Sequence, residues 1–488
     1  MSTAPAGADD CRTLAGTIAE SNVERLARIG VGGVERMQRS KPDPPHQDGW
    51  YANFVLGTLL VAYIFSYIDR NILALLVGPI RLDLNISDFE VSLLQGPAFA
   101  IFYSTMALPV AHLADTRRRT SIIAWGIAFW SATTACCGVA RSFGSLFLLR
   151  LGVGLGEAAL SPPAASLLSD YFQPRQLPRA MAIFSLGISL GTGMSFLIGG
   201  LVVEMVAGMS QVSLPLVGDV RSWQLTFFII GLPGLLLSVL VYSIREPRRR
   251  GGLLDADGEL EIIAPNETLR FLMHRWRLYV SFPVATAFLG IFGYGMAAWY
   301  PTFLIRTYGL STGEAGTLFG VVYVIFGPLG TLFGVRLAER LQASGYRDAH
   351  VRFILLASCG LWVFGVVGPL MPSVELACVM LVPAVFLKSS YLGSSASAMQ
   401  LVTPNQLRAQ VTALQIFFAN IIGMTVGASG IAFLTDFVFA DDQAIRYSLS
   451  WIAGLTCLFA VLTLMTCLKP YARAVDEAEE RAASTELS

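Results

Sequence analysis

The 488-residue sequence has little charge for its length. Only 14% of its residues are Asp, Glu, Lys or Arg, whereas 54% are hydrophobic. A soluble globular chain carries about 25% charged residues, so this shortage excludes an ordinary soluble domain and indicates a chain largely embedded in a membrane. The formal net charge is zero. The sequence therefore lacks the basic excess with which nucleic-acid-binding proteins attract phosphates, and no nucleic-acid partner is expected.

Lysine, histidine and clustered cysteine are scarce as well. Only three of the 34 basic residues are Lys, only four residues are His, and the seven cysteines show no metal-binding spacing. We therefore expect free thiols, no metal site and no cofactor. The first 49 residues are polar and mixed, without a short apolar segment before a cleavage site, so no signal peptide is expected.

Long apolar runs, by contrast, are frequent. A membrane-spanning helix needs about 20 predominantly apolar residues. The sequence predicts twelve such segments, at 51–79, 88–114, 119–140, 143–170, 176–206, 222–244, 278–305, 312–337, 350–370, 373–401, 407–435 and 445–468. We expect an all-α membrane protein with five parts: a tail 1–49, a six-helix bundle 50–245, a central loop 246–277, a second six-helix bundle 278–469 and a tail 470–488.

Basic residues are distributed unequally between the loops of the two sides. Loops on the side of the N-terminus hold 17 of them, and the opposite loops hold five. The positive-inside rule then places both termini, both tails and the central loop in the cytoplasm. The preference for Arg over Lys is typical of GC-rich bacterial genomes, so the inner membrane of a bacterium is the expected location.

The two halves resemble each other in register. Ser87 and Glu90 open the second predicted helix, and the pair Ser311 and Glu314 opens the eighth, 224 residues later; both pairs fit a capping box. Each half begins on the same side of the membrane, so the repeats are parallel. This layout of six plus six helices resembles that of major facilitator transporters, whose binding sites lie between the halves.

Five charged residues fall within predicted spans: Asp69, Arg70, Arg150, Glu157 and Lys388. A charge at the centre of a span costs about 2.5–3.5 kcal/mol on insertion scales, so such residues usually face a protein interior and serve a function. Arg150 and Glu157 lie two helical turns apart on one face, separated by roughly 10 Å. We expect cross-helix pairs of Asp69 with Arg150 and of Arg70 with Glu157.

Two interpretations of this charged set remain open. The five residues could be inert ion pairs that lock the first helix to the fourth. Their unequal signs favour instead a site for an anionic substrate. In that site Asp69 and Glu157 are the proton-coupling groups, and the three cations Arg70, Arg150 and Lys388 are their partners and bind the substrate anion.

The tenth predicted helix is unusually hydroxylated after Lys388. Ser390, Tyr391 and Ser394 make it poorly suited to contact with lipid, so we expect it to form a polar wall of a cavity. Alternatively, Lys388 snorkels toward the membrane surface and the hydroxyls bond to their own backbone.

Two motifs resemble the Spinster-type members of the major facilitator superfamily. The stretch "YIDRNILALL", from Tyr67, resembles the family's Asp-Arg signature in the first helix, and "RLGVGLGEAALSP", from Arg150, resembles its signature in the fourth. The superfamily pattern covers residues 50–470. It implies alternating access, in which the halves rock around a central cavity lined mainly by helices one, four, seven and ten. Spinster relatives move amphipathic lipids in a proton-linked manner, although related anion symporters also carry an Asp-Arg pair.

The resemblance also implies a cavity wall on the seventh helix. An anionic head near the membrane cations and a tail along aromatic side chains would suit an amphiphilic substrate. Tyr294, Trp299 and Tyr300 are the candidates for that wall. The same residues could equally anchor the helix at the membrane interface.

A cytoplasmic gate is implied by "AHLADTRRRT", which resembles the superfamily's loop motif between the second and third helices. Asp115 and Arg119 match that motif. Glu339 and Arg340 stand at the corresponding place of the second half, and we include them in the expected gate. A basic loop that only satisfies the topology is the plainer interpretation.

The sequence therefore predicts a proton-coupled secondary transporter of an anionic amphiphile, such as a lysophospholipid or a sphingoid phosphate. Its expected partners are the lipid bilayer, the substrate and protons, and it is expected to be a monomer. A proton-coupled symporter of a small organic anion is the alternative, and a ligand sensor without transport is a third. An enzyme is not expected, because the G-x-S-x-G match at Gly187 lies within a helix and lacks the strand before a nucleophile elbow.

Overall fold

The computed structural model describes residues 49–173, 175–209, 212–214, 218–247, 249, 272–273, 275–403 and 407–486. The predicted N-terminal tail and most of the central loop lie outside the described residues. The chain divides into two compact units, one formed by His46–Val475 and one by Met1–Pro45 with Asp476–Ser488. The larger unit, called the membrane unit below, contains both predicted bundles. Of the smaller unit, the structure describes only the final turns of one helix.

Eleven helical segments in the described residues are long and apolar enough to cross a membrane. They are Gly49–Leu75, Arg119–Cys137, Phe143–Tyr171, Leu177–Ala207, Ser222–Tyr242, Trp276–Tyr308, Thr312–Ala343, Ala349–Leu370, Val374–Val402, Gln410–Phe439 and Asp442–Glu480. Each matches one of the twelve predicted spans. The remaining prediction, 88–114, is occupied by two helices, α4 (Asp88–Gln95) and α5 (Pro97–Thr116), which meet at Gly96. The predicted all-α membrane fold is confirmed.

The first half of the membrane unit, called the N-half, carries nine of the described helices. Besides α4 and α5 they are α2 (Gly49–Asn71), α3 (Val77–Leu84), α6 (Arg119–Cys137), α7 (Phe143–Glu157), α8 (Ser161–Tyr171), α9 (Leu177–Ala207) and α10 (Ser222–Tyr242). A short antiparallel hairpin, β1 (Val212–Leu214) and β2 (Gly218–Val220), joins α9 to α10, with Val212 opposite Val220.

The second half, called the C-half, carries seven described helices. They are α12 (Trp276–Tyr279), α13 (Ser281–Tyr308), α14 (Thr312–Ala343), α15 (Ala349–Val367), α16 (Val374–Val402), α17 (Arg408–Phe433) and α18 (Ile445–Glu486). The last helix continues well beyond residue 468, where the sequence predicted its end. All six cysteines in the described residues are free thiols, as expected.

Local sequence explains where several helices begin and break. Both predicted capping boxes are present: Ser87 and Glu90 cap α4, and the equivalent serine and glutamate cap α14. Besides the span 88–114, two predicted spans are broken where the sequence suggested continuous helices. The first changes from α2 to a 3₁₀ segment at Ile72, and the fourth ends α7 at Glu157 and resumes as α8, which has a proline in its first turn. Both breaks adjoin the charged motifs.

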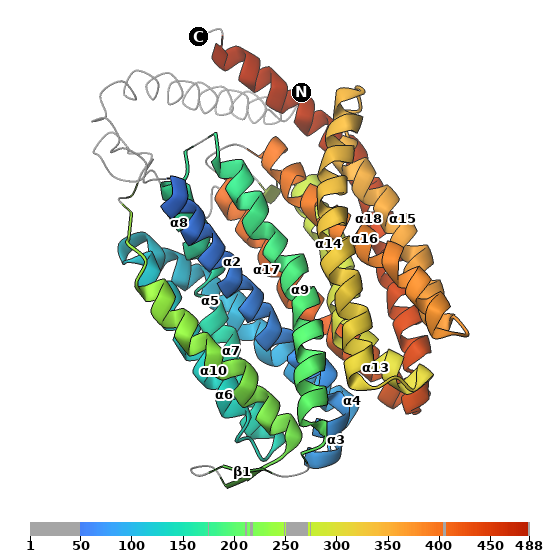
Figure 1. Cartoon of the computed structure of the whole chain (residues 1–488). Coiled ribbons are helices and arrows are strands. Elements are labelled where there is room, and N and C mark those ends of the chain that lie inside the picture. Colours follow the sequence, from blue (N-terminus) through green and yellow to red (C-terminus); the bar gives the residue numbers. More distant parts are fainter. Residues whose placement is uncertain are drawn as a thin grey trace, which may run out of the picture. The chain divides into compact units, whose positions relative to one another are not determined.

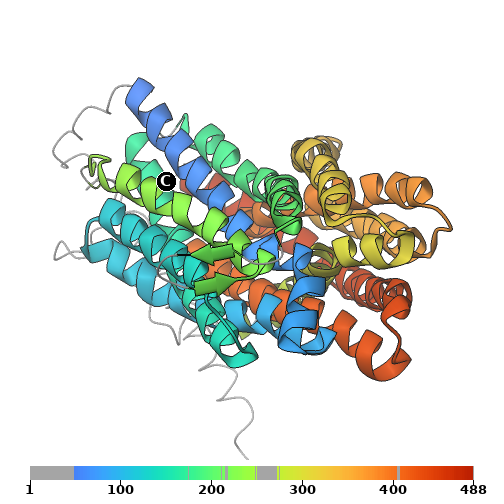
Figure 2. The same cartoon turned by 60° about the horizontal axis from the view of Figure 1, so that its bottom comes forward.

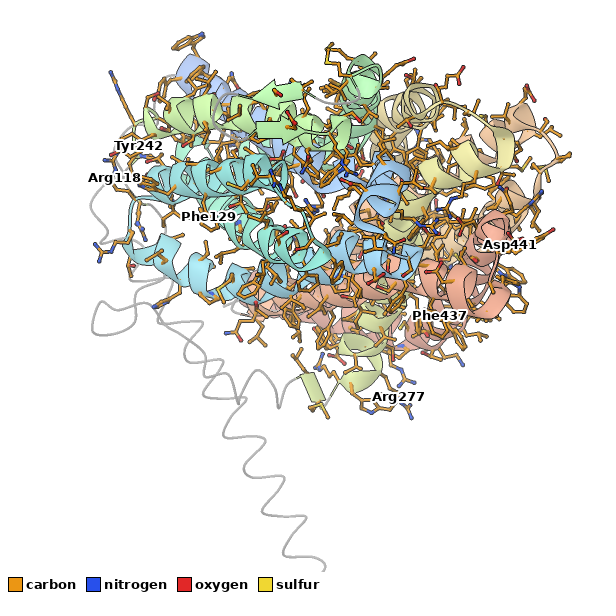
Figure 3. All side chains as sticks on the ribbon, turned by 90° about the horizontal axis from the view of Figure 1, so that it is seen from below. Arg118, Phe129, Tyr242, Arg277, Phe437 and Asp441 are labelled. Atoms are coloured by element: carbon orange, nitrogen blue, oxygen red, sulfur yellow. The ribbon has the colours of Figure 1, made fainter. Side chains whose placement is uncertain are left out.

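The N-half and C-half lie side by side in the membrane unit (Figure 1). In the rotated view most of the blue-to-green helices lie on the left and most of the yellow-to-red helices on the right (Figure 2). Along the boundary α9 packs against α14, and α17 packs against α4 and α5. Glycines allow the first of these contacts, since a Cβ at Gly320 would lie 2.7 Å from the carbonyl oxygen of Gly193. The outer flanks expose aromatic rings such as Phe129 and Tyr242 on the N-half and Phe437 on the C-half (Figure 3).

The membrane unit has two ends, a near end and a far end. The near end carries Gly49, at the start of α2, and the far end carries the β1–β2 hairpin together with α3 and α4 (Figure 1).

Candidate functional site

The centre of the site is a buried ion pair between α2 and α7. The Nη2 atom of Arg70 lies 2.6 Å from Oε2 of Glu157, and the side chains are 6% and 1% exposed. Such charge-assisted contacts are short and strong. The pair lies at the two helix breaks, because Arg70 is the second-last residue of α2 and Glu157 is the last residue of α7. The expected pairing of these two residues is therefore present.

Part of this ion pair remains available to another group. Within the described residues, Nε of Arg70 and Oε1 of Glu157 have no hydrogen-bond partner. The guanidinium carbon of Arg70 also lies 4.7 Å from the ring centre of Tyr67, 4.4 Å from that of Phe99 and 4.8 Å from that of Tyr103. Aromatic faces attract a cation without cancelling its charge. Arg70 is thus held in place while keeping one donor unused.

Arg150 contacts backbone rather than a carboxylate. It donates hydrogen bonds to the carbonyl oxygens of Asp69 at 3.0 Å, Arg70 at 3.2 Å and Leu94 at 3.4 Å. The expected pairing of Arg150 with the Asp69 carboxylate was wrong. The reason is the end of α2 at Asn71, which leaves the last carbonyls of that helix without partners inside it. The buried guanidinium satisfies two of them.

Asp69 is correspondingly left without the partner that the sequence suggested. Its side chain is 1% exposed, and its Oδ1 atom has no hydrogen-bond partner among the described residues. It therefore lies beside the ion pair of Arg70 and Glu157 along the chain but takes no part in it.

Lys388 is a cation without an acid. Its Nζ atom lies 5.2 Å from the ring centre of Tyr323 on α14, and it makes no ion pair or hydrogen bond with any described residue. A Cβ at Gly293 would lie 3.0 Å from Cε of Lys388, so α13 passes close to this side chain. Lys388 therefore retains a charge that no described carboxylate balances.

Only one of the three expected wall residues on α13 faces the space between the halves. Tyr294 lines that space and donates a hydrogen bond to Oδ1 of Asn420 at 2.7 Å. Trp299 instead donates to the carbonyl oxygen of Ala428 at 2.8 Å and is fully buried against α17. Tyr300 lines an apolar pocket inside the C-half, away from the space between the halves. The cavity-wall prediction was therefore wrong for Trp299 and Tyr300, since both rings fill contacts between helices.

The hydroxyl groups after Lys388 also serve helix packing. Ser390 donates to the carbonyl oxygen of Phe386 in its own helix at 2.7 Å, and Ser394 donates to that of Gly334 in α14 at 3.0 Å. Tyr391 is buried. Because their hydroxyls are used in this way, the polar-wall prediction for Ser390 and Ser394 was wrong, and the plainer alternative describes Ser390.

A small pocket lies between the halves beside the ion pair. Its lining residues are Arg70, Asn71, Ala74 and Gln95 from the N-half and Tyr294, Ala297, Ala298, Met424 and Ala428 from the C-half. The centres of water molecules could occupy about 30 Å³ of it, and one water needs roughly 10–15 Å³ by this measure. In this conformation the pocket has room for a small polar group.

Among the described side chains of the predicted cytoplasmic gate, none forms an ion pair between the halves. Arg119 pairs within its own half, with Asp170 at 2.5 Å and with Glu246 at 2.8 Å. Glu339 and Arg340 lie near the end of α14 and make no ion pair with described residues. The side chain of Asp115 lies outside the described part of the structure. Arg119 is thus joined to the start of the central loop and not to the C-half.

The carboxylate of Glu246 is held in its charged form. Burial by itself raises its pKa, but hydrogen bonds from the backbone N–H of Thr120, the Arg119 guanidinium and the Thr120 hydroxyl outweigh burial and lower that pKa below its ordinary value. The ion pair between Arg119 and Glu246 therefore persists at neutral pH.

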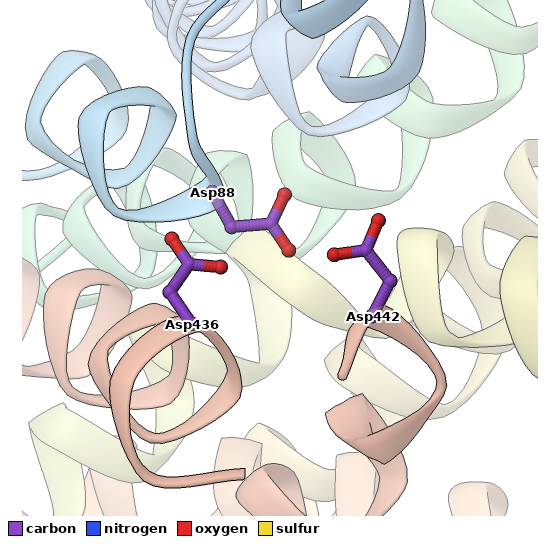
Figure 4. Close-up of side chains that lie close together, drawn as sticks. All are labelled: Asp88, Asp436 and Asp442. Carbon is purple, nitrogen blue, oxygen red and sulfur yellow. The ribbon is translucent and has the colours of Figure 1, made fainter. Parts of the chain in front are cut away.

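Charged residues connect the halves at the far end. This far-end network consists of Arg81, Asp88, Arg306, Asp436 and Asp442 (Figure 4 shows its three acids). Arg306 binds Asp88 through two hydrogen bonds of 2.5 and 2.8 Å, and Arg81 binds Asp442 at 2.7 Å. Asp436 accepts a hydrogen bond of 2.6 Å from the backbone N–H of Phe89 in the first turn of α4. Each of these three contacts crosses from one half to the other.

The three acids of the far-end network lie close enough to suggest a cation site, since one oxygen of each lies within 4.8 Å of the others. The two guanidinium groups occupy the same place, however: Arg81 also lies 3.1 Å from Asp88, and Arg306 lies 4.0 Å from Asp442. Opposite charges at these distances explain why the acids gather. These ion pairs hold the far ends of the two halves together.

A family model describes most of the chain. The model of the Major Facilitator Superfamily matches residues 59–428. The chain belongs to the Major Facilitator Superfamily. The six-plus-six architecture and the site between the halves agree with this membership, and the chain is a transporter of this superfamily.

Within the superfamily the chain is similar to proteins of several names. An "MFS-type efflux pump" of Mycolicibacterium smegmatis is 28% identical over 394 residues, which cover 79% of this chain and 85% of that protein. "Protein spinster homolog 1" of Homo sapiens is 28% identical over 336 residues, 63% of this chain and 60% of that protein. A "Probable L-galactonate transporter" of Escherichia coli is 23% identical over 425 residues, which cover 84% of this chain and 88% of that protein. The chain is Spinster-like.

The fold is also found in solved structures of the superfamily. A bacterial homolog of the human lysosomal transporter Spinster, in an inward-facing and unoccupied conformation, superposes with a TM-score of 0.70. It is 24% identical, and the match covers 89% of this chain and 99% of that one. At this identity the likeness establishes the superfamily fold.

The far-end network and the glutamine of the pocket were not predicted from the sequence. A signal for the network was present, because Arg81 and Arg306 are two of only five basic residues on that side and lie 225 residues apart, close to the repeat offset. Gln95 had no such signal. It is a neutral residue at the end of a short helix. Its place in the pocket depends on the break between α4 and α5 at Gly96, which no local pattern in the sequence indicated.

Proposed function

We propose that this protein is a proton-coupled secondary transporter that moves an anionic amphiphile, such as a lysophospholipid or a sphingoid phosphate, by alternating access. The observation that carries the proposal is the buried ion pair of Arg70 and Glu157 beside a pocket that both halves line. A buried pair offers little net stability compared with apolar side chains. Its position at two helix breaks favours a role in transport.

The coupling step follows from the charges. Protonation of Glu157 removes its negative charge and weakens its hold on Arg70. The freed guanidinium then attracts the anionic head of the substrate, with Lys388 as a second cation. Occupancy of the site thereby depends on the proton, and any difference in affinity between the two conformations shifts their populations. Asp69 is proposed as a second proton-sensitive group.

The expected orientation in the membrane decides which end of the described conformation faces the cytoplasm. If both termini are cytoplasmic, as the distribution of basic residues predicts, the near end faces the cytoplasm and the far-end network closes the outer side. The proposed cell-membrane location then makes this the conformation closed to the outside. Tyr294 and the aromatic rings around Arg70 would contact the substrate's apolar part.

The decisive experiment is transport of a labelled lysophospholipid into proteoliposomes, with and without an imposed pH gradient. We expect wild-type protein to accumulate the lipid when the gradient is present. Glu157→Gln should lose gradient-driven accumulation, because a permanently neutral side chain cannot exchange a proton. The same variant should retain exchange of lipid across the membrane without a gradient. Glu314→Gln is the matched control, since glutamine serves in a capping box as well as glutamate.

Two results would contradict the proposal in different ways. Gradient-driven accumulation by Glu157→Gln with the wild-type pH dependence would remove Glu157 from the coupling step. A wild-type protein that is folded yet moves no lysophospholipid would remove the amphiphile as substrate.

A small organic anion is the second candidate substrate. The polar wall of the pocket, formed by Arg70, Asn71 and Gln95, favours it, as does the similarity to a "Probable L-galactonate transporter". Uptake of a labelled sugar acid in the same proteoliposomes tests this candidate directly.

A further inference from the structure

Gln95 is a buried amide without partners. Both of its side-chain polar atoms, Nε2 and Oε1, are shielded from solvent, and neither has a hydrogen bond within the described residues. Leaving a buried donor or acceptor unpaired costs about 1–3 kcal/mol, so native proteins rarely leave a whole amide group in this state. Gln95 also lines the pocket between the halves. These two observations together point to a group that enters the pocket and pairs with it.

The local fold explains why Gln95 reaches the pocket. Helix α4 ends at Gln95, and α5 begins with Pro97 after a break at Gly96. A Cβ at Gly96 would lie 2.4 Å from the carbonyl oxygen of Met424, so only glycine lets α17 approach this closely. The approach brings Met424 and Ala428 over the pocket opposite Gln95. The side chain at the end of α4 is thereby enclosed between the halves.

The polar atoms of the pocket define the chemistry that fits it. Gln95 offers one donor group and one acceptor, and Nε of Arg70 offers a further unused donor and a positive charge. Asn71 is already engaged, because its amide donates to Oγ of Ser195 at 3.1 Å. An amide that both donates and accepts matches a hydroxyl group, which also does both. The free space suits one such small group.

We propose that Gln95 is a specificity-determining residue that binds a hydroxyl group next to the substrate's anionic group, so that the site selects hydroxylated anions. This inference rests on the proposed function and narrows its substrate class. The chemistry is shared by two sources: an amphiphile with a free glycerol hydroxyl and a small hydroxylated carboxylate. In both, Arg70 receives the anion and Gln95 receives the neighbouring hydroxyl.

The test compares hydroxylated ligands with their deoxy analogues on the full-length protein in nanodiscs. One pair is 1-acyl-glycerol-3-phosphate and 1-acyl-propanediol-3-phosphate, and the other is a sugar acid and its 2-deoxy analogue. Wild-type protein should bind the hydroxylated member of one pair at least tenfold more tightly. In Gln95→Met, which keeps the length of the side chain, that ratio should fall to about one, with the affinity for the deoxy analogue unchanged. The pair that shows the preference identifies the source.

A matched control separates specificity from folding. Gln224 is another buried glutamine, but its amide donates to the carbonyl oxygen of Ala140 at 2.8 Å and accepts from the backbone of Arg221. Gln224→Met should lower the melting temperature and leave the ligand ratio unchanged. Gln95→Met should change the ratio and leave the melting temperature constant or raise it, because its amide has no partner among the described residues to lose and its unpaired burial is itself unfavourable.

The outcomes distinguish this inference from the proposed function. A wild-type ratio near one in both pairs, with clear binding, overturns the role of Gln95 alone. Persistence of the preference in Gln95→Met also overturns it alone. A wild-type protein that binds neither member of either pair overturns the anionic-substrate function together with the inference that rests on it.

Discussion

The three cations of the predicted spans differ in what surrounds their charge. Arg70 faces the Glu157 carboxylate, Arg150 faces backbone carbonyl oxygens, and Lys388 faces the ring of Tyr323. A carboxylate neutralises a cation, carbonyl dipoles solvate it, and an aromatic face only attracts it. At this scale Lys388 is the residue whose charge remains most available to a substrate anion, whereas Arg150 is committed to the backbone.

Replacing Lys388 tests this ranking. We expect Lys388→Met to weaken binding of an anionic amphiphile at least tenfold, because it removes the cation that no described acid balances. The melting temperature should stay constant or rise, since an unpaired ammonium group that is partly buried carries a desolvation cost. Equilibrium binding and thermal unfolding of the purified protein measure both effects.

The control for Lys388 is another lysine of the same chain. Lys469→Met makes the same chemical change at an exposed position of α18 and should affect neither quantity. Equal affinities of wild-type protein and Lys388→Met would show that Lys388 does not contact the substrate.

At the scale of elements, the broken helices place the chemistry. The first span leaves the α-helical conformation one residue after Arg70, the fourth breaks directly after Glu157, and the second breaks directly after Gln95. A helix break leaves backbone groups unpaired in a setting without water, so it is tolerated only where protein or a cavity satisfies them. Breaks in three neighbouring spans therefore mark the binding region more sharply than any single side chain does.

The break at Gly96 can be tested through packing. Gly96→Ala should destabilise the protein by about 1–3 kcal/mol, because the added methyl group would lie 2.4 Å from the backbone oxygen of Met424. Relief of this clash requires a shift of the α17 backbone or of the α4–α5 junction. Thermal unfolding of the purified protein measures the loss.

Gly144→Ala is the matched control, because a Cβ there has no atom within 4 Å, and alanine favours a helix over glycine. A melting temperature equal to wild type for Gly96→Ala would mean that α17 does not press against the α4–α5 junction.

At the scale of the whole membrane unit, the positions of the helices along the chain could be predicted from the sequence better than the partners of individual side chains. Each span carries its own signal in apolar length and in end caps such as Ser87 with Glu90, so the helices could be placed from local information. The partner of Arg150 depended on where α2 ends, which no local pattern showed. The contact of Arg81 with Asp442 joins residues 361 positions apart, and only the packed halves bring them together.

The far-end network should control the balance between the two conformations. Asp88 is buried and holds Arg306 through two hydrogen bonds, and removing one partner of a buried pair costs about 3–5 kcal/mol. Asp88→Asn should therefore increase the population with separated far ends at least tenfold. Spin labels at the exposed positions Leu82 and Phe437, one on each half, report the separation as a distance distribution.

Glu375→Gln provides the control for this measurement. Glu375 lies in the first turn of α16, at the exposed far end of the C-half, and makes no ion pair with described residues. Its replacement should leave the distances as in wild type. An unchanged distribution in Asp88→Asn would show that packing between α9 and α14, and not the charges, keeps the far ends together.

The contact of Arg150 with the end of α2 also bears on how the chain enters the membrane. The carbonyl groups of Asp69 and Arg70 receive their donor from a residue synthesised 80 positions later than Arg70. Until the fourth span is inserted, those groups must keep water or the insertion machinery as partners, because hydrocarbon offers none. We therefore expect the first helix to reach its final depth only after the fourth has been inserted, so that the motif that begins at Arg150 affects the order of assembly as well as the shape of the site.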